Sequence, residues 1–486
     1  MVHLRLNPKP FMQKTDAPKP QSVGEALRDF FRSFTDLGVL PKALWIIIGV
    51  YVVESMAYFG VLTLMTHYLS TDLRWGDRPA GVAVSVFTML VTLFMLGVGS
   101  WAEKQGLRRA ILMALVFSTI GRLAYCLAPQ AGGFASGIII FSILLVAMGS
   151  GILTPSCYSG VKQFTDEKTH SMGYAMIYAW MNLGIVGIGA LSAWIRPAVQ
   201  EIMDGKGQGT PLPFLAFLRN YSVSGAHAVN WVCLGITLIA LAGFLVLMTR
   251  RQEATRLRPE TDTAPQVRRN LRGFFKHYFT EGPFANPRFL FFIFMLLPVR
   301  TLFAHQWLTM PEYILRAYPQ NVADRMEWLV NWINPLIIFF GVPILTALTR
   351  RVHVYTMMVV GTLVSAAPTF LLCAGPHLGL LITYFVVFSI GEALWSARFL
   401  EYAAELAPPG RVAQFMGLAN IPWLLAKGTT GFYSGYMLET FCAKGLPPEQ
   451  LQTEWIWLVY GIFAMTTPVG LWLARKWVAA GLQTKH

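Results

Sequence analysis

Residues 43–69 read ALWIIIGVYVVESMAYFGVLTLMTHYL and contain a single charged side chain, Glu54. A helix needs about 20 mostly apolar residues to cross the hydrocarbon core of a bilayer. The stretch therefore predicts a membrane-spanning helix that carries a carboxylate near its middle.

Eleven further stretches have the same apolar character. They cover residues 80–101, 109–127, 135–160, 172–195, 226–248, 289–315, 328–348, 355–374, 378–404, 413–439 and 454–474. Six spans precede a polar segment and six follow it, which is typical of two fused halves that bind substrate between them. The predicted fold is an all-α membrane protein with twelve transmembrane helices, in six-helix bundles at 43–248 and 289–477.

Composition and charge support this prediction. The 486 residues are 55% apolar and only 13% charged, against roughly 25% charged in soluble proteins, which argues against a soluble enzyme or a disordered chain. Most of the 39 Lys and Arg residues lie in the N-terminal segment 1–42, the linker 249–288, the tail 478–486 and short loops on the same side. The positive-inside rule places these segments in the cytoplasm, with both termini, and accounts for the net charge of +14 without a nucleic-acid partner.

Signatures of other classes are missing from the sequence. It contains no GxxxxGK[ST] phosphate-binding loop and no HExxH motif, and its five cysteines are scattered. A membrane-embedded enzyme would need a cluster of His, Asp or Glu near an interface, and the sequence shows none. We therefore expect a transporter and not an enzyme. We expect it to lie in the plasma (inner) membrane as a monomer and to bind no metal or cofactor.

The loop between the second and third spans reads GSWAEKQGLRR at residues 99–109. It resembles the GxxxDRxGRR signature of the major facilitator superfamily, with Glu103 in place of Asp and with Arg109 at the matching position. A carboxylate and basic residues on a short loop can form ion pairs that hold one conformation closed, so Glu103 and Arg109 are candidate gating residues. The alternative is a loop whose charge only sets topology.

Five pieces spread over both halves are similar to motifs of the proton-dependent oligopeptide transporter family. They are ESMAYFG at 54–60, GSGILTP at 149–155, YAWMNLG at 178–184, the Asn-Pro pair at 334–335 with Pro343, and GEALWS at 391–396. The resemblance implies proton-coupled symport of a peptide or peptide-like small organic solute by alternating access.

Several charged positions of that family are replaced. Its first Glu and its Arg on the first helix fall at Tyr51 and Ser55, its Lys on the fourth helix becomes Thr154, and a Pro becomes Ala397. In the family, the lost charges serve proton coupling and bind the peptide carboxylate. An uncoupled facilitator, a carrier of amines, organic anions or drugs, and a transport-dead receptor or sensor therefore remain alternatives.

Charged residues near mid-membrane are the candidate functional groups, because each costs at least about 2.5 kcal/mol to insert. Glu54 and Glu392 lie near the middle of the first and tenth spans, and protonation removes the cost of burying their charge. Both are candidate proton-coupling residues, with His305 as a third. The alternatives are a structural ion pair for Glu54 and a packing role for His305.

Candidate substrate-binding residues combine charge with a polar lining. Arg300 is the best substitute for the lost cations, or it pairs with Glu54 or Glu392 to offset burial. Lys427 is another candidate to bind an anionic group. In the family, the counterpart of Glu392 binds the cationic end of the substrate. The polar lining comprises Tyr58, Tyr178, Asn182, Gln306, Asn334 and Ser396.

The remaining charges on the spans suggest gates or structural contacts. Glu312 lies near the predicted outside end of the seventh span and is a candidate gate. Arg398 and Glu401 are three residues apart on one helix, so they can pair with each other; we interpret both as gating residues. Arg122, deep in the third span, is interpreted as structural.

Overall fold

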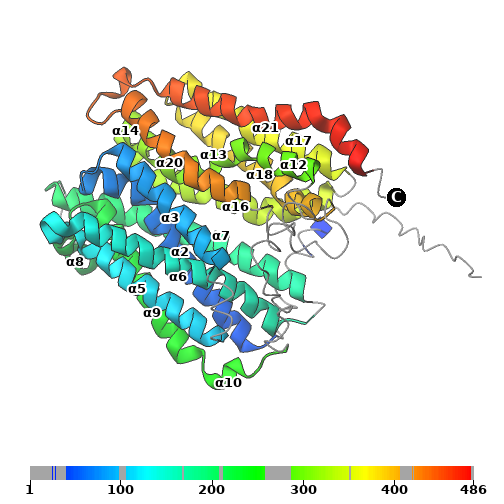
Figure 1. The fold of residues 1–486 in the computed structure, drawn as a ribbon. Coiled ribbons are helices and arrows are strands. Elements are labelled where there is room, and N and C mark those ends of the chain that lie inside the picture. The colour runs from blue at the N-terminus through cyan, green and yellow to red at the C-terminus, as the bar shows by residue number, and fades with distance from the viewer. Residues whose placement is uncertain are drawn as a thin grey trace, which may run out of the picture.

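The computed structural model describes residues 24–25, 28, 40–97, 106–166, 169–206, 212–257, 286–349, 352–405, 419 and 421–482. Within these ranges the regular secondary structure is helical throughout, without a strand. The helices form two groups that lie side by side, the N-terminal half coloured blue to green and the C-terminal half green to red in Figure 1.

In the described part of the N-terminal half there are six long helices and four short elements. The long helices are α2 (Lys42–His67), α3 (Asp77–Gly97), α5 (Leu107–Leu127), α6 (Ala135–Phe164), α7 (His170–Met203) and α9 (Gly225–Leu247). The short elements are η1 (Tyr68–Asp72), η2 (Ala128–Phe134), α8 (Pro213–Tyr221) and α10 (Arg250–Glu253).

The C-terminal half repeats this plan with one broken helix. Its first span consists of α12 (Pro287–Met295), α13 (Leu297–Leu308) and α14 (Met310–Ala317). The other elements are α15 (Gln320–Ala323), α16 (Met326–Leu348), α17 (Val354–Ala366), η5 (Ala367–Ala374), α18 (Leu378–Glu405), α20 (Ile421–Phe441), η6 (Pro448–Gln450) and α21 (Thr453–Leu482).

Every predicted span contains a helix, and the described residues include ten candidate membrane spans by length and composition. One of the ten, Leu107–Phe164, runs through both α5 and α6 and includes a kink where Gly132 has a φ of 54°. The polar helix α20 is not among the ten, and residues 413–418 of its predicted span lie outside the described ranges.

The structure differs from the prediction in the seventh span, which is interrupted twice. Breaks at Leu296 and Thr309 are each followed by a proline in the next first turn, Pro298 and Pro311. Proline has no N–H to donate to the preceding turn, so it is tolerated at the start of a helix and interrupts a longer one. The helix α8 was not predicted either.

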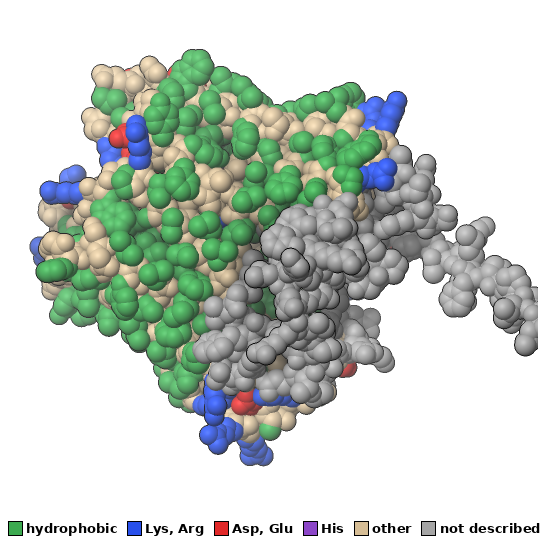
Figure 2. Space-filling model, in the orientation of Figure 1, with side chains coloured by type: hydrophobic (Ala, Val, Ile, Leu, Met, Phe, Trp, Pro, Cys, Tyr) green, Lys and Arg blue, Asp and Glu red, His purple; other side chains and the backbone are tan. Residues whose placement is uncertain are grey.

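The exterior is that of an integral membrane protein. Large apolar side chains face outward, among them Phe134, Val246 and Leu473 at 80%, 73% and 68% exposure. Figure 2 shows apolar side chains over the visible face of the molecule, with Lys and Arg mainly at its edges. This distribution suits contact with lipid along the helices and with water at their ends.

The two halves meet along α3 with α20 and along α7 with α16. The α3–α20 contact is made by glycines: a Cβ atom placed on Gly431 would collide with the carbonyl oxygen of Gly81, and one on Gly435 would collide with the backbone of Asp77. The backbone N–H of Gly431 donates a hydrogen bond of 2.7 Å to the Ser85 hydroxyl. The two helices therefore approach to backbone contact.

Candidate functional site

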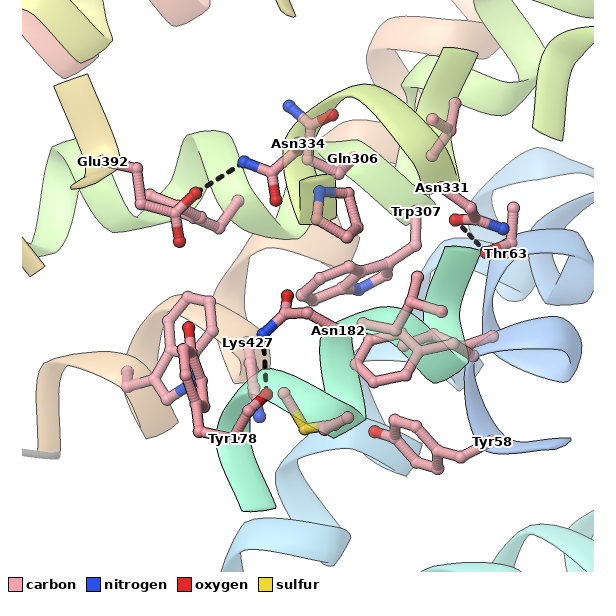
Figure 3. A pocket seen from close by; sticks show the side chains of 18 residues that line it. Tyr58, Thr63, Tyr178, Asn182, Gln306, Trp307, Asn331, Asn334, Glu392 and Lys427 are labelled. Atoms are coloured by element: carbon pink, nitrogen blue, oxygen red, sulfur yellow. Dashed lines mark hydrogen bonds between the residues drawn. The ribbon is translucent and has the colours of Figure 1, made fainter. Parts of the chain in front are cut away.

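A cavity of about 320 Å³ is lined by residues of both halves, and Figure 3 shows its polar side chains facing one space. Its lining includes Tyr58, Thr63, Tyr178, Asn182, Gln306, Trp307, Asn331, Asn334, Glu392, Trp423 and Lys427. Helices α2 and α7 of the N-terminal half contribute only uncharged side chains, whereas the charged ones come from α18 and α20 of the C-terminal half.

All the predicted substrate-binding residues line this cavity or an adjoining one. Arg300 and Ser396 are the two that lie outside the main cavity, and they line a second cavity of about 190 Å³. Glu392 and Trp423 line both. The main cavity lies between the halves, whereas the lining of the second cavity comes from the C-terminal half alone.

Glu392 is held by a neighbouring amide. The Asn334 Nδ2 atom donates a 2.6 Å hydrogen bond to the Glu392 carboxylate and lies 3.1 Å from the Ser389 hydroxyl. Asn334 precedes Pro335 in α16, and both line the main cavity. The amide can hold the carboxylate while a ligand in the cavity contacts its remaining surface.

The two predicted cations are surrounded by aromatic rings. The Arg300 guanidinium carbon lies 4.4 Å from the ring centre of Phe399, 5.4 Å from that of Trp395 and 5.7 Å from that of Trp423. The Lys427 ammonium lies 5.0 Å from the Trp423 ring centre. No described carboxylate lies within ion-pair distance of either cation.

Glu54 has an ionic partner. It lines a third cavity of about 240 Å³, which it shares with Lys427. Its carboxylate lies 2.5 Å from the Arg122 guanidinium of α5, and both side chains are almost completely buried. Arg122 also donates to the Thr237 hydroxyl of α9. The geometry is that of the structural ion pair considered as the alternative for Glu54, and it gives Arg122 a defined partner.

His305 lies outside the three cavities, in the packing of the C-terminal half. Its Nδ1 atom is 2.8 Å from the Thr309 hydroxyl and its Nε2 atom is 3.2 Å from the Tyr433 hydroxyl. Its ring stacks on Tyr460 with 3.6 Å between ring centres. This is the packing geometry weighed above against a proton-relay role.

Four of the lining residues named above were not singled out from the sequence: Thr63, Trp307, Asn331 and Trp423. The Thr63 hydroxyl donates a 3.1 Å hydrogen bond to the side-chain amide oxygen of Asn331 across the two halves. One turn further along α2, the Thr66 hydroxyl donates to the Trp307 carbonyl. Asn331 could have been found because it lies three residues before Asn334, on the same face of the helix; Thr63 has no such signal.

An ionic network joins the halves at one end of the molecule, which we call the α14 end. Arg316 of α14 donates two 2.8 Å hydrogen bonds to Asp77 of α3 and lies 2.6 Å from the Glu312 carboxylate. Glu312 also lies 3.0 Å from the His67 ring of α2. The predicted gate residue Glu312 therefore belongs to a set of charges that bridges both halves.

A second bridge at the α14 end joins α7 to α16. The Arg196 guanidinium contacts both carboxylate oxygens of Glu327, at 2.5 and 3.0 Å, and donates to the Ala323 carbonyl. Glu327 is fully buried. A third pair, Arg78 with Glu439, also crosses between the halves there but is half exposed.

The remaining predicted gating residues are only partly described. Glu103 lies outside the described residues, and so does the side chain of Glu401. Arg109 is exposed, while its neighbour Arg108 donates 2.7 Å to the Met248 carbonyl within the N-terminal half. Arg398 is buried, with a 3.5 Å contact to the Thr349 hydroxyl.

Comparison with known proteins identifies the family. Residues 47–426 match the model of the Major Facilitator Superfamily. The chain is 23% identical over 434 residues to the dipeptide and tripeptide permease A of Salmonella typhimurium, covering 82% of this chain and 83% of the relative.

Two solved POT family transporters have the same fold. One, in complex with a thioalcohol-conjugated peptide, has a TM-score of 0.66 at 16% identity, and the other, in complex with 5-aminolevulinic acid, has 0.65 at 15%. Each comparison covers 90% of this chain and 97% of the solved one. The chain thus belongs to the Major Facilitator Superfamily and is a membrane transporter that resembles the proton-dependent oligopeptide transporters.

Proposed function

We propose that the protein is a proton-coupled symporter that imports a peptide or peptide-like small organic solute by alternating access. The observation that carries the proposal is the central cavity, in which Glu392 faces neutral polar groups of the opposite half. The name of the permease relative and the ligands of the solved neighbours support a peptide-like substrate.

Glu392 is the residue to which we assign the coupling proton. A proton on this carboxylate neutralises a charge that apolar surroundings penalise, and it changes how Asn334 and a ligand share the carboxylate oxygens. Glu54 is less suited because Arg122 offsets its charge. His305 is less suited because both ring nitrogens lie within hydrogen-bond distance of hydroxyl groups.

The substrate contacts follow from the lining. Tyr58, Tyr178 and Asn182 of the N-terminal half offer hydroxyl and amide groups, and Gln306 and Asn334 of the C-terminal half offer amides. A small polar solute in contact with both sets would bridge the two halves. Such a bridge is what a carrier needs if occupancy is to bias the conformational change.

We assign the α14 end to the outside of the cell and both termini to the cytoplasm. We also propose that the protein lies in the plasma membrane and is a monomer. The ion pairs of Arg196, Asp77 and Glu312 support a conformation in which this outer end is shut. Import then requires these pairs to separate while substrate enters, and to re-form before it is released on the other side.

The test is proton movement in liposomes containing the purified protein and an interior pH dye, with an inward proton gradient. We expect a peptide pool to cause acidification, and we expect Glu392→Gln to abolish it. Glu449→Gln, at an exposed position in η6, is the control and should behave as the unmodified protein. Counterflow without proton movement in the unmodified protein would identify a facilitator, and absence of both would favour a receptor.

A further inference from the structure

The three cavities together carry more positive than negative charge. Glu54, Glu392, Arg300 and Lys427 are the charged side chains among the described residues that line them. Arg122 offsets Glu54 through their ion pair. Before the coupling proton binds, Glu392 is ionised, so one carboxylate and two cations remain and the site without substrate has an excess of one positive charge.

Aromatic faces stabilise these two cations in place of carboxylates. A ring face attracts a cation without neutralising it, and it leaves the N–H groups available to an anion. The Arg300 side chain is only 7% exposed, and its Nε atom has no hydrogen-bond partner among the described residues. The geometry is that of a binding site for an anionic group.

The two cations line adjoining cavities that share Glu392 and Trp423, and both lie beside the Trp423 ring. Lys427 lines the main cavity and Arg300 lines the adjoining one, while Glu392 lines both. A substrate that places its ammonium group at Glu392 therefore meets one cation in each cavity. Ser396 adds a hydroxyl to the cavity of Arg300.

We propose that the preferred substrates are acidic: peptide-like solutes with one ammonium and two carboxylate groups, such as a dipeptide with an acidic side chain. This inference rests on the proposed function and specifies its substrate class. Glu392 binds the ammonium, Lys427 binds one carboxylate and Arg300 binds the other. The net charge of such a substrate cancels the excess charge of the site, and uncompensated charge at mid-membrane is costly.

The experiment compares uptake of three dipeptides, Ala-Glu, Ala-Gln and Ala-Lys, into proteoliposomes under an inward proton gradient. Ala-Glu and Ala-Gln have nearly the same shape and differ in charge. A hydrogen bond to a charged group contributes about 1.5 kcal/mol or more, so we expect Ala-Glu to be taken up with at least about tenfold higher efficiency than Ala-Gln. Ala-Lys should be the poorest of the three.

Variants connect the preference to Arg300. Arg300→Gln should reduce the ratio of Ala-Glu to Ala-Gln uptake to about one, and Arg300→Lys should retain part of it. Arg325→Gln removes an exposed positive charge from the N-terminus of α16 and should leave the ratio unchanged.

Equal uptake of Ala-Glu and Ala-Gln by the unmodified protein would overturn this inference and leave the proposed function intact. Preferred uptake of Ala-Lys, or an Arg300→Gln variant with the full ratio, would also overturn it. Uptake of none of the three peptides would overturn the proposed function and this inference with it.

Discussion

The ion pair between Arg196 and Glu327 ties α7 to α16, and removing the Glu327 charge tests whether the α14 end opens during transport. Glu327 is fully buried, and Arg196 is 11% exposed. Glu327→Gln keeps the shape of the side chain but leaves the guanidinium beside a neutral amide. The polar partners of Arg196 in this contact are then the Ala323 carbonyl and the amide oxygen of the new side chain, and neither carries a charge.

The size of the effect follows from burial. Breaking a buried ion pair by removing one partner costs about 3 kcal/mol. The two residues belong to different halves, so in a conformation with this end open both are hydrated and the cost does not arise. The substitution should therefore shift the equilibrium toward the open form by about a hundredfold.

Spin labels on either side of the contact measure the shift by pulsed EPR. Glu201 on α7 and Asn321 on α15 are exposed and belong to opposite halves. Replacing Cys373 with serine removes the native cysteine that is not buried. The unmodified chain should give one short distance between the labels, and Glu327→Gln should add a longer one.

The half-exposed pair of Arg78 and Glu439 provides the matched control. It joins the same halves at the same end, but its side chains are 56% and 52% exposed. Such pairs contribute at most about 1 kcal/mol, so Glu439→Gln should leave the distances unchanged. If a folded Glu327→Gln protein shows the short distance alone, or if both variants shift equally, the buried pair does not hold this end closed.

Three further changes have distinct expected results. Arg122→Gln leaves Glu54 buried without its cation and should lower stability by about 3 kcal/mol, read from thermal unfolding in detergent; adding Glu54→Gln should restore most of it. His305→Gln should cost about 1 kcal/mol of stability while proton-driven uptake keeps its pH profile; a changed profile would assign a relay role to the ring. Gly431→Val places a side chain against Gly81 and should lengthen the distance between the spin labels at positions 201 and 321. An unchanged distance would mean that the helices accommodate the added side chain without separating.

The positions of the helices were predictable because the bilayer imposes its requirement on each span separately. The apolar run around Glu54 becomes α2, and the other spans follow by the same rule. The residues at which the helices begin and end were less predictable. Pro298 and Pro311 break the seventh span, although its apolar run continues through both.

Part of the site was predictable, since Asn334 and Glu392 belong to recognisable motifs and charges within apolar runs are conspicuous. The contacts between the two halves could not be predicted from the sequence. Arg196 and Glu327 are separated by 131 residues, and each lies near a helix end, where charge is ordinary. Their pairing depends on how α7 approaches α16, a property of the assembled halves that no local pattern encodes.

The glycine contact between α3 and α20 bears on how fast the carrier can turn over. Interlocked side chains must settle again into single rotamers each time two surfaces close, and that ordering costs free energy. Where Gly81 meets Gly431, backbone touches backbone and there are no rotamers to settle. At these positions the halves can part and rejoin in every cycle with few side chains to reorder, among them Ser85, whose hydroxyl accepts from the Gly431 N–H.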